Sequence, residues 1–175
     1  MGHDRRHTIR TDLRPGDLGA VVQLHGATYG RERGWDVTFE AYVAAPLAEF
    51  ALRADHRERI WIAEREGRVV GCVAVVAVGP RVAQLRWFLV DPASRGAGLG
   101  RSLLSESLKF ARAVGCSRIV LWTERSLGAA ARLYQEAGFR LLEEKPGRHW
   151  GADVVEQLYE LDLSGSAEVS GPPRP

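Results

Sequence analysis

The amino-acid sequence predicts one α/β domain built on a mixed central sheet of about seven strands, with helices on both faces. Three observations support this class. The 175 residues are 45% hydrophobic and 26% charged, as in an ordinary globular domain. Three strand patterns follow one another between residues 59 and 90, joined by turns too short for a crossover, so they should pair antiparallel. After residue 90, strand patterns alternate with helical ones, which favours parallel pairing in the middle of the sheet.

The first elements lie before residue 59. Residues 8–13 alternate between apolar and polar side chains, which is typical of a half-buried strand. Asp17 is a candidate N-cap for a first helix. Residues 26–36 hold glycines and aromatic side chains, and we expect them to form a loop. A second helical pattern begins near Thr38, and Pro46 should interrupt or kink it.

The later elements follow from periodicity and from glycine stop signals. The three antiparallel strands are expected at 59–65, 69–78 and 83–90. They are followed by a helix at 99–114, a strand at 118–123, a helix at 126–137 and two strands ending at Leu163. We therefore place the folded domain at residues 7–163. Residues 164–175 are rich in proline, glycine and serine, and they are expected to be a disordered tail.

Charge and cysteine usage exclude several classes of partner. The formal net charge is only +2, and charges of both signs alternate along the chain, which argues against a nucleic-acid-binding face. Cys72 and Cys116 lie far apart in apolar surroundings, which indicates buried reduced thiols and no metal site. Residues 1–7 contain no apolar signal segment, and the longest apolar run, 69–78, is shorter than the ~20 residues of a membrane span. We expect a cytoplasmic protein without a membrane partner.

The strongest local signal lies between residues 90 and 102. A strand ends there, three glycines stand at alternate positions, and an amphipathic helix begins. Unobstructed backbone N–H groups at a helix N-terminus form an anion site for a phosphate or pyrophosphate, and Arg95 and Arg101 add positive charge. The third glycine of the dinucleotide fingerprint and the Gly-Lys-Ser/Thr of a P-loop are both missing. A purely structural turn is the alternative interpretation.

Two segments together resemble the GNAT superfamily of N-acetyltransferases. Arg95-x-x-Gly98-x-Gly100 is similar to the acyl-CoA loop of that superfamily, and residues 130–139 are similar to its A-x-x-L-Y-x-x-x-G-F helix and strand. The resemblance covers about residues 7–163. The chain also resembles the acetyltransferase half of bacterial proteins that fuse this domain to a winged helix-turn-helix regulator. One departure is Leu127, where the family often has an Asn that helps to hold the pantetheine arm.

The resemblance implies transfer of an acetyl group from acetyl-CoA to a primary amine, expected to belong to a small molecule, by direct attack through a tetrahedral intermediate and without a metal. It also allows a homodimer. The Phe88 N–H would meet the oxyanion, and Tyr134 would protonate the departing thiolate, unless Tyr134 is only a packing residue. The residues implied to bind CoA are Phe88, Leu89, Val90, Arg95, Gly96, Ala97, Gly98, Leu99, Gly100, Arg101 and Ser102.

Other parts of the site stay open. The strand at 83–90 lacks the Glu that related families often use as the base; the open candidates are Glu32, Glu40, Glu64, Glu124, His25 and His149. The substrate should be shaped by residues 29–40 and by the turn at 146–151. The strands at 83–90 and 118–123 should diverge at their C-terminal ends, so that the pantetheine lies between them. The alternative function is a non-catalytic domain that binds acyl-CoA as a sensor.

Overall fold

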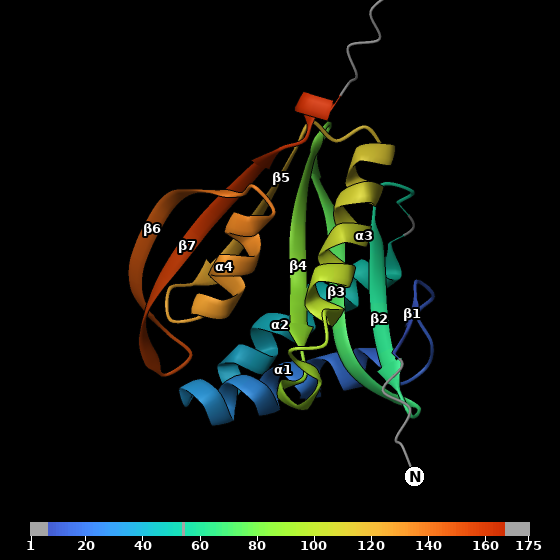
Figure 1. The fold of residues 1–175 in the computed structure, drawn as a ribbon. Helices are drawn as coiled ribbons and strands as arrows, with labels where there is room; N and C mark the ends of the chain where they lie inside the picture. Colours follow the sequence, from blue (N-terminus) through green and yellow to red (C-terminus); the bar gives the residue numbers. More distant parts are fainter. Residues whose placement is uncertain (1–6, 54, 167–175) are drawn as a thin grey trace, which may run out of the picture.

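Within residues 7–53 and 55–166, the part described by the computed structural model, seven strands form one sheet. The strands are β1 (Thr8–Arg10), β2 (Arg59–Arg65), β3 (Arg68–Gly79), β4 (Val82–Val90), β5 (Arg118–Glu124), β6 (Arg140–His149) and β7 (Ala152–Asp162). The helices are α1 (Asp17–Arg33), α2 (Val37–Leu52), α3 (Leu99–Ala113) and α4 (Gly128–Glu136), with the 3₁₀ turns η1 (Pro92–Ser94) and η2 (Ser164–Ser166). The sheet order is β1-β2-β3-β4-β5-β7-β6 (Figure 1).

The predicted fold class is confirmed, with one refinement in the pairing. Strands β1 to β4 pair antiparallel, and β4 pairs parallel with β5. We expected further parallel pairing, but it stops at this one pair. The chain leaves β5 through α4 to the edge strand β6 and then turns back, so that β7 pairs antiparallel with both β5 and β6. The tight β6–β7 hairpin therefore decides the pairing at this edge.

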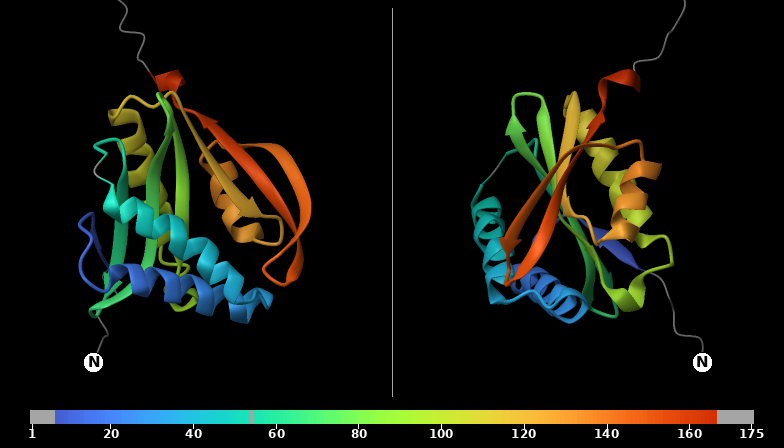
Figure 2. Two further views of the ribbon diagram at one scale, coloured as in Figure 1. Left: turned by 180° about the vertical axis from the view of Figure 1, so that it is seen from behind. Right: turned by 90° about the vertical axis from the view of Figure 1, so that its left-hand side faces the viewer.

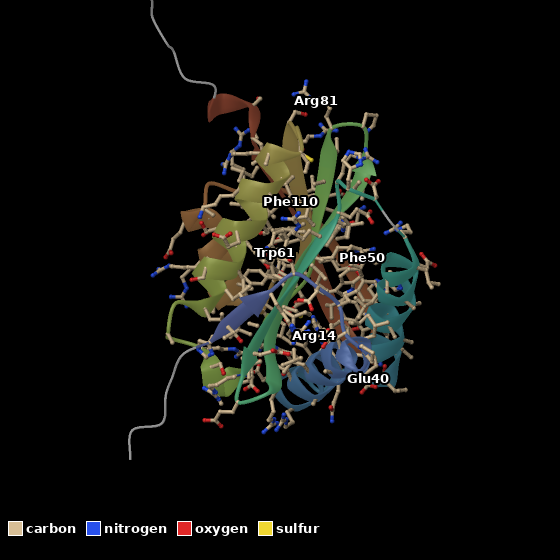
Figure 3. All side chains as sticks on the ribbon, turned by 90° about the vertical axis from the view of Figure 1, so that its right-hand side faces the viewer. Arg14, Glu40, Phe50, Trp61, Arg81 and Phe110 are labelled. Carbon is tan, nitrogen blue, oxygen red and sulfur yellow. The ribbon has the colours of Figure 1, made fainter. Side chains whose placement is uncertain are left out.

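Each face of the sheet has its own core. Helices α3 and α4 cover one face, and α1 and α2 cover the other (Figures 1 and 2). On the first face the Trp61 ring meets Phe110 edge-on with centroids 5.6 Å apart, and on the second Phe50 meets Trp87 in the same way at 5.5 Å. Figure 3 labels Trp61 and Phe110 on one side of the strands and Phe50 on the other. Burial on both faces is the main source of stability in such a sheet.

The predicted loop at residues 26–36 is wrong, because α1 continues as a helix to Arg33. The glycine that suggested a loop is a packing residue: a Cβ on Gly26 would lie 2.3 Å from the Glu40 Oε1 of α2, so the absent side chain lets the helices approach. The N-cap of α1 is Gly16, not Asp17. Helix α2 is not interrupted at Pro46.

The chain ends follow the predictions only in part. Strand β1 stops at Arg10, shorter than expected. The turn η2 occupies the first residues of the predicted tail, and residues 167–175 lie outside the described residues. None of the described helices is long and apolar enough to cross a membrane. The domain limits at 7 and 163 stay a prediction.

A largely buried ion pair joins the first strand to the first helix. The Arg10 guanidinium donates to both Asp17 carboxylate oxygens, at 2.8 and 2.7 Å, and to Glu64 of β2 at 2.7 Å. The hydrogen bond from Arg10 is the largest cause that holds the pKa of Asp17 below its ordinary value of 3.8. A carboxylate whose pKa is lowered by folding stabilises the protein above that ordinary value, and the stabilisation is lost as the pH falls through the folded pKa.

We expect Asp17→Asn to lower the free energy of unfolding at pH 7 by about 3 kcal/mol, because it leaves a buried guanidinium short of one partner. Urea unfolding at pH 7 and at pH 3 measures this, and the difference from the unmodified chain should shrink at the lower pH. The matched control is Asp12→Asn, since the Asp12–Arg14 pair lies on the surface and should leave the midpoint unchanged. Equal midpoints for both variants would contradict the structural role of Asp17.

Candidate functional site

The site is built around a split in the sheet. Strands β4 and β5 pair from Val82 with Arg118 to Leu85 with Leu121, and the pairing ends there. Beyond that point the strands separate, and β5 leaves β4 together with the β6–β7 hairpin (Figure 2). The predicted divergence of the two C-terminal strand ends is confirmed. An extended ligand can use unpaired backbone groups at such an edge in the way that an added strand does.

A β-bulge at Trp87 changes the face of the sheet on which the following β4 side chains lie, at the point where the split begins. The register with β3 shifts between Cys72 and Ala74, and Trp87 has the unusual φ of 48°. Leu85 lies in the core under α3, whereas Trp87, two residues on, lies in the core under α1 and α2. The buried Cys72 thiol donates to the Trp87 carbonyl at 3.0 Å, and burial raises the pKa of that thiol to about 12, so it keeps the proton it donates.

A cavity of about 130 Å³ lies beside the split. Its walls are mainly aromatic: Trp150, in the turn between β6 and β7, packs against Trp35, Phe39 and Tyr42 with ring centroids 4.5, 5.0 and 5.3 Å away. The Asp36 N–H donates to the Trp150 carbonyl at 2.9 Å, which ties the turn to the start of α2. Both segments expected to shape the substrate, 29–40 and 146–151, therefore contribute to one cavity.

Tyr134 lies at the junction of the cavity and the sheet. It is only 5% exposed, its ring lies 6.0 Å from that of Phe88, and both side chains line the cavity. Burial raises the pKa of the Tyr134 hydroxyl well above its ordinary value of 10.0, and the nearby Tyr29 raises it further. The phenol is therefore protonated at neutral pH. This protonation state fits a proton donor, the role that the sequence resemblance implies.

The glycine loop takes the form that the sequence predicts for an anion site. Gly96 and Gly98 have φ values of +82° and +80°, and a Cβ on either would have no atom within 4 Å, so the space above the loop is open. Helix α3 begins at Leu99. Among the described residues, no acceptor takes a hydrogen bond from the N–H groups of residues 99–101. The helix N-terminus thus presents free donors and partial positive charge to solvent.

The other predicted loop residues have more varied roles. The Ser102 N–H already donates to the Gly98 carbonyl, so only its hydroxyl is left for a ligand. The Arg95 guanidinium pairs with Glu32 of α1 at 2.8 Å, and that of Arg101 pairs with Glu136 of α4 at 2.8 Å. Both expected phosphate-binding charges are thus partly neutralised by carboxylates from neighbouring helices.

Gly100 connects the loop to the cavity. A Cβ at this position would lie 3.5 Å from Leu133 of α4 and 3.8 Å from the ring of Phe88. Since Phe88 also lines the cavity beside Tyr134, one continuous path of contacts leads from the helix N-terminus through β4 into the cavity. The loop and Tyr134, which are far apart in the sequence, are parts of one site.

The candidates for the base differ in their partners and in whether they line the cavity. Glu32 pairs with Arg95, Glu64 with Arg10, and Glu40 packs against Gly26, away from this cavity. His149 lies 3.5 Å from the Glu156 carboxylate. Of these candidates, only Glu124 and His25 line the cavity.

Both of those candidates are engaged elsewhere. One Glu124 oxygen accepts from the Ser126 N–H and hydroxyl, and the other accepts from the Val155 N–H at 3.5 Å. The His25 ring bonds through Nδ1 to the Val21 carbonyl, and burial lowers its pKa to about 4, so it is neutral at pH 7 and a weak base. Neither is well suited to take a proton from an amine.

Sequence reasoning missed two charged residues of the cavity, Arg86 and Glu156. Glu156 of β7 is the direct cross-strand partner of Glu124, and Arg86 lies on β4 immediately before the bulge. Strand alternation alone predicts that Arg86 faces away from the α3 core, but not what it meets there. The pairing of β7 with β5, which brings Glu156 to the split, has no signal in the sequence.

The comparisons with known proteins agree on one family. The model of the acetyltransferase (GNAT) family matches residues 22–139. An uncharacterized N-acetyltransferase of Schizosaccharomyces pombe is 33% identical over 119 residues, which cover 66% of this chain and 72% of that protein. N-acetyltransferase family 8 member 3 of Rattus norvegicus is 36% identical over 92 residues, covering 50% of this chain but only 40% of that protein.

A solved structure extends the likeness to the whole domain. An acetyltransferase from Salmonella typhimurium, solved with its cofactor acetyl-CoA, superposes with a TM-score of 0.69 at 23% identity, covering 93% of this chain and 96% of that one. At this identity the likeness concerns the fold. The likeness to winged helix-turn-helix fusion proteins stays a prediction.

Proposed function

The chain belongs to the GNAT acetyltransferase family, and from that premise we propose that it transfers an acetyl group from acetyl-CoA to a primary amine of a small molecule. The observation that carries this proposal is the continuous path from the free N–H groups of residues 99–101, past Phe88, to Tyr134 and the aromatic cavity. A donor and an acceptor that approach from opposite ends of this path would meet beside Tyr134. We also propose a cytoplasmic location; a homodimer is an expectation from the family resemblance.

The residues present fit a CoA-type ligand. Its pyrophosphate would accept from the N–H groups at the start of α3, where Gly96 and Gly98 leave open space, and its pantetheine arm would run along Phe88, Leu89 and Val90 in the split. When bound, acetyl-CoA supplies an activated acetyl thioester. Leu127 lines the cavity in place of the family's frequent Asn, so the arm would rely on backbone contacts there.

The acid in the proposed reaction is Tyr134. A thiolate leaves more readily when it receives a proton, and a buried tyrosine that stays protonated at neutral pH can supply one. The Phe88 N–H, next to the bulge, would donate to the carbonyl oxygen as negative charge develops on it.

The base in the proposed reaction is Glu156. An alkyl amine has a pKa of about 10.4 and must lose a proton before or during attack. Glu156 lines the cavity, and among the described residues its carboxylate is paired only with His149, at 3.5 Å, whereas Glu124 is already bonded through both oxygens. The Glu156 carboxylate can therefore accept the proton directly or through one water molecule.

Release of free thiol from acetyl-CoA tests the proposed function. With a panel of primary amines, we expect thiol release that depends on the amine, saturates with its concentration, and is absent with the N-trimethylated form of the same amine. The trimethylated control keeps the positive charge but has no proton to lose. Binding of CoA without amine-dependent thiol release for any primary amine would instead support the acyl-CoA sensor.

A further inference from the structure

The cavity contains an unpaired positive charge. Among residues 7–53 and 55–166, eight other arginines form salt bridges with carboxylates, whereas no carboxylate pairs with the half-buried Arg86. The two arginines of the glycine loop, Arg95 and Arg101, both form salt bridges with glutamates. A guanidinium that is partly removed from water without a counter-ion is costly, unless a ligand completes the pair.

Strand alternation and the β-bulge together place Arg86 and Trp87 on the same side of β4. Ala83 and Leu85 face the α3 core, so Arg86 faces α1 and α2, and the bulge then turns Trp87 to the same side. As a result, the Arg86 guanidinium lies over the Trp87 ring, 5.5 Å from its centroid. The guanidinium also hydrogen-bonds the Tyr42 hydroxyl. Stacking on an aromatic face fixes its plane, and its remaining N–H groups can donate to a ligand.

A carboxylate faces the same space without neutralising Arg86. Both Arg86 and Glu156 lie close enough to Tyr42 to act on its pKa, which Arg86 lowers and Glu156 raises, while burial has the largest effect and raises it. Arg86 and Glu156 nevertheless form no salt bridge with each other. The cavity therefore presents separate positive and negative groups between aromatic walls, which is complementary to a ligand that carries both an ammonium and an anionic group.

We propose that the acceptor is an amine that also carries an anionic group, such as an amino acid, with its anion on the Arg86 guanidinium and its amino group toward Glu156. This inference rests on the proposed acetyl transfer and specifies its substrate class. Carboxylates and phosphonates share the planar or forked oxygen pairs that arginine binds in a bidentate way. The cavity of about 130 Å³ fits a small acceptor of this kind.

Arg86 is assigned to the acceptor and not to CoA because of its position. It lies on the α1–α2 side of β4, while the free N–H groups of residues 99–101 lie at the start of α3 on the opposite face. The anion loop also has its own cations, Arg95 and Arg101. Removing the Arg86 charge should therefore leave the affinity for CoA unchanged.

Calorimetric binding to the CoA-saturated protein tests the assignment independently of turnover. The probes are α- and ω-amino acids and aminoalkyl phosphonates, each with its neutral amide or ester and with the amine that lacks the acidic group. We expect at least one acid to bind about 10- to 100-fold more tightly than both neutral counterparts, the advantage that a charge-assisted pair confers. The amine without the acidic group controls for the charge on nitrogen, since it is fully protonated at pH 7.

Three variants complete the experiment. Arg86→Gln should reduce the advantage of the acid to less than about threefold, and Arg86→Lys should retain part of it, because a single charge without the fork persists. Arg112→Gln, an exposed arginine near the end of α3, is the matched control and should behave like the unmodified chain. Affinity for CoA should be the same in all four proteins.

The outcomes are separable. The assignment is overturned if no acid binds more tightly than its neutral counterparts, or if the advantage of the acid survives in Arg86→Gln. Thiol release measured separately, with acetyl-CoA in place of CoA and the same proteins and amines, reports on the proposed function alone: tight, Arg86-dependent binding of acids without thiol release would refute acetyl transfer and leave the anion site standing. Equal thiol release from acids and neutral amines would support acetyl transfer and refute the anion site at Arg86.

Discussion

Replacing Tyr134 by Phe should lower kcat by about 10²- to 10⁴-fold while leaving the affinity for acetyl-CoA nearly unchanged. The substitution removes one hydroxyl and keeps the ring, so the contacts with Phe88 and Phe139 persist and the fold should be retained. What is lost is the proton for the departing thiolate, and positioned acid catalysis contributes a factor of this size. A fall in kcat with little change in ground-state binding is the signature of an interaction made in the transition state.

The matched control is Tyr159→Phe. Tyr159 is buried beside Tyr134, with ring centroids 6.2 Å apart, but its hydroxyl points to Gln157 at 3.4 Å and it does not line the cavity. We expect this variant to keep its kcat. Steady-state rates with the best amine of the panel, together with unfolding midpoints for both variants, make the comparison. Full activity of Tyr134→Phe would show that Tyr134 is a packing residue and that water protonates the thiolate.

The pH profile adds a second test of the same assignment. Because burial raises the pKa of Tyr134 far above 10.0, the acid form is present throughout the range in which the protein can be assayed. Activity should therefore not fall on the alkaline side through loss of the Tyr134 proton. It should instead rise with pH as the amine loses its proton, and Tyr134→Phe should lower the whole curve without changing its shape.

The motif residues of the site could be predicted because they are local. Gly96, Gly98 and the start of α3 are contiguous in the sequence, and backbone geometry at a helix N-terminus does not depend on distant partners. The split between β4 and β5 was expected from the resemblance to the GNAT fold, not from the strand pattern itself. By contrast, the length of α1 was missed because Gly26 serves contact with α2, and a packing glycine is indistinguishable from a loop glycine in a single sequence.

The acceptor side could not be predicted because it depends on long-range pairing. Arg86 faces the cavity through strand alternation, but Trp87 joins it on that side only through a bulge at a non-glycine residue with φ of 48°, which no local rule specifies. Glu156 reaches it because β7 inserts between β5 and β6, which the sequence did not indicate. Two residues that look like ordinary strand charges thus become a pair of opposite charges in one cavity.

Gly98→Val should reduce the affinity for CoA by at least about 100-fold. A side chain above Gly98 would occupy the open space at the start of α3 and separate the pyrophosphate from two or more N–H groups, each charge-assisted bond being worth about 1.5–3 kcal/mol. The left-handed backbone at Gly98 also disfavours any residue with a Cβ, by roughly 1–2 kcal/mol of folding stability. Strain and loss of binding must therefore be told apart.

Gly115→Val separates the two effects. Gly115 has φ of +82°, against +80° at Gly98, and a Cβ there also meets no atom within 4 Å, but it lies at the opposite end of α3. Both variants should lose similar stability in urea, whereas only Gly98→Val should lose affinity for CoA by calorimetry. Pantetheine, which has no pyrophosphate, should bind both variants alike. If Gly98→Val and Gly115→Val bind CoA equally well, the glycines only shape a turn, and the anion must be held elsewhere.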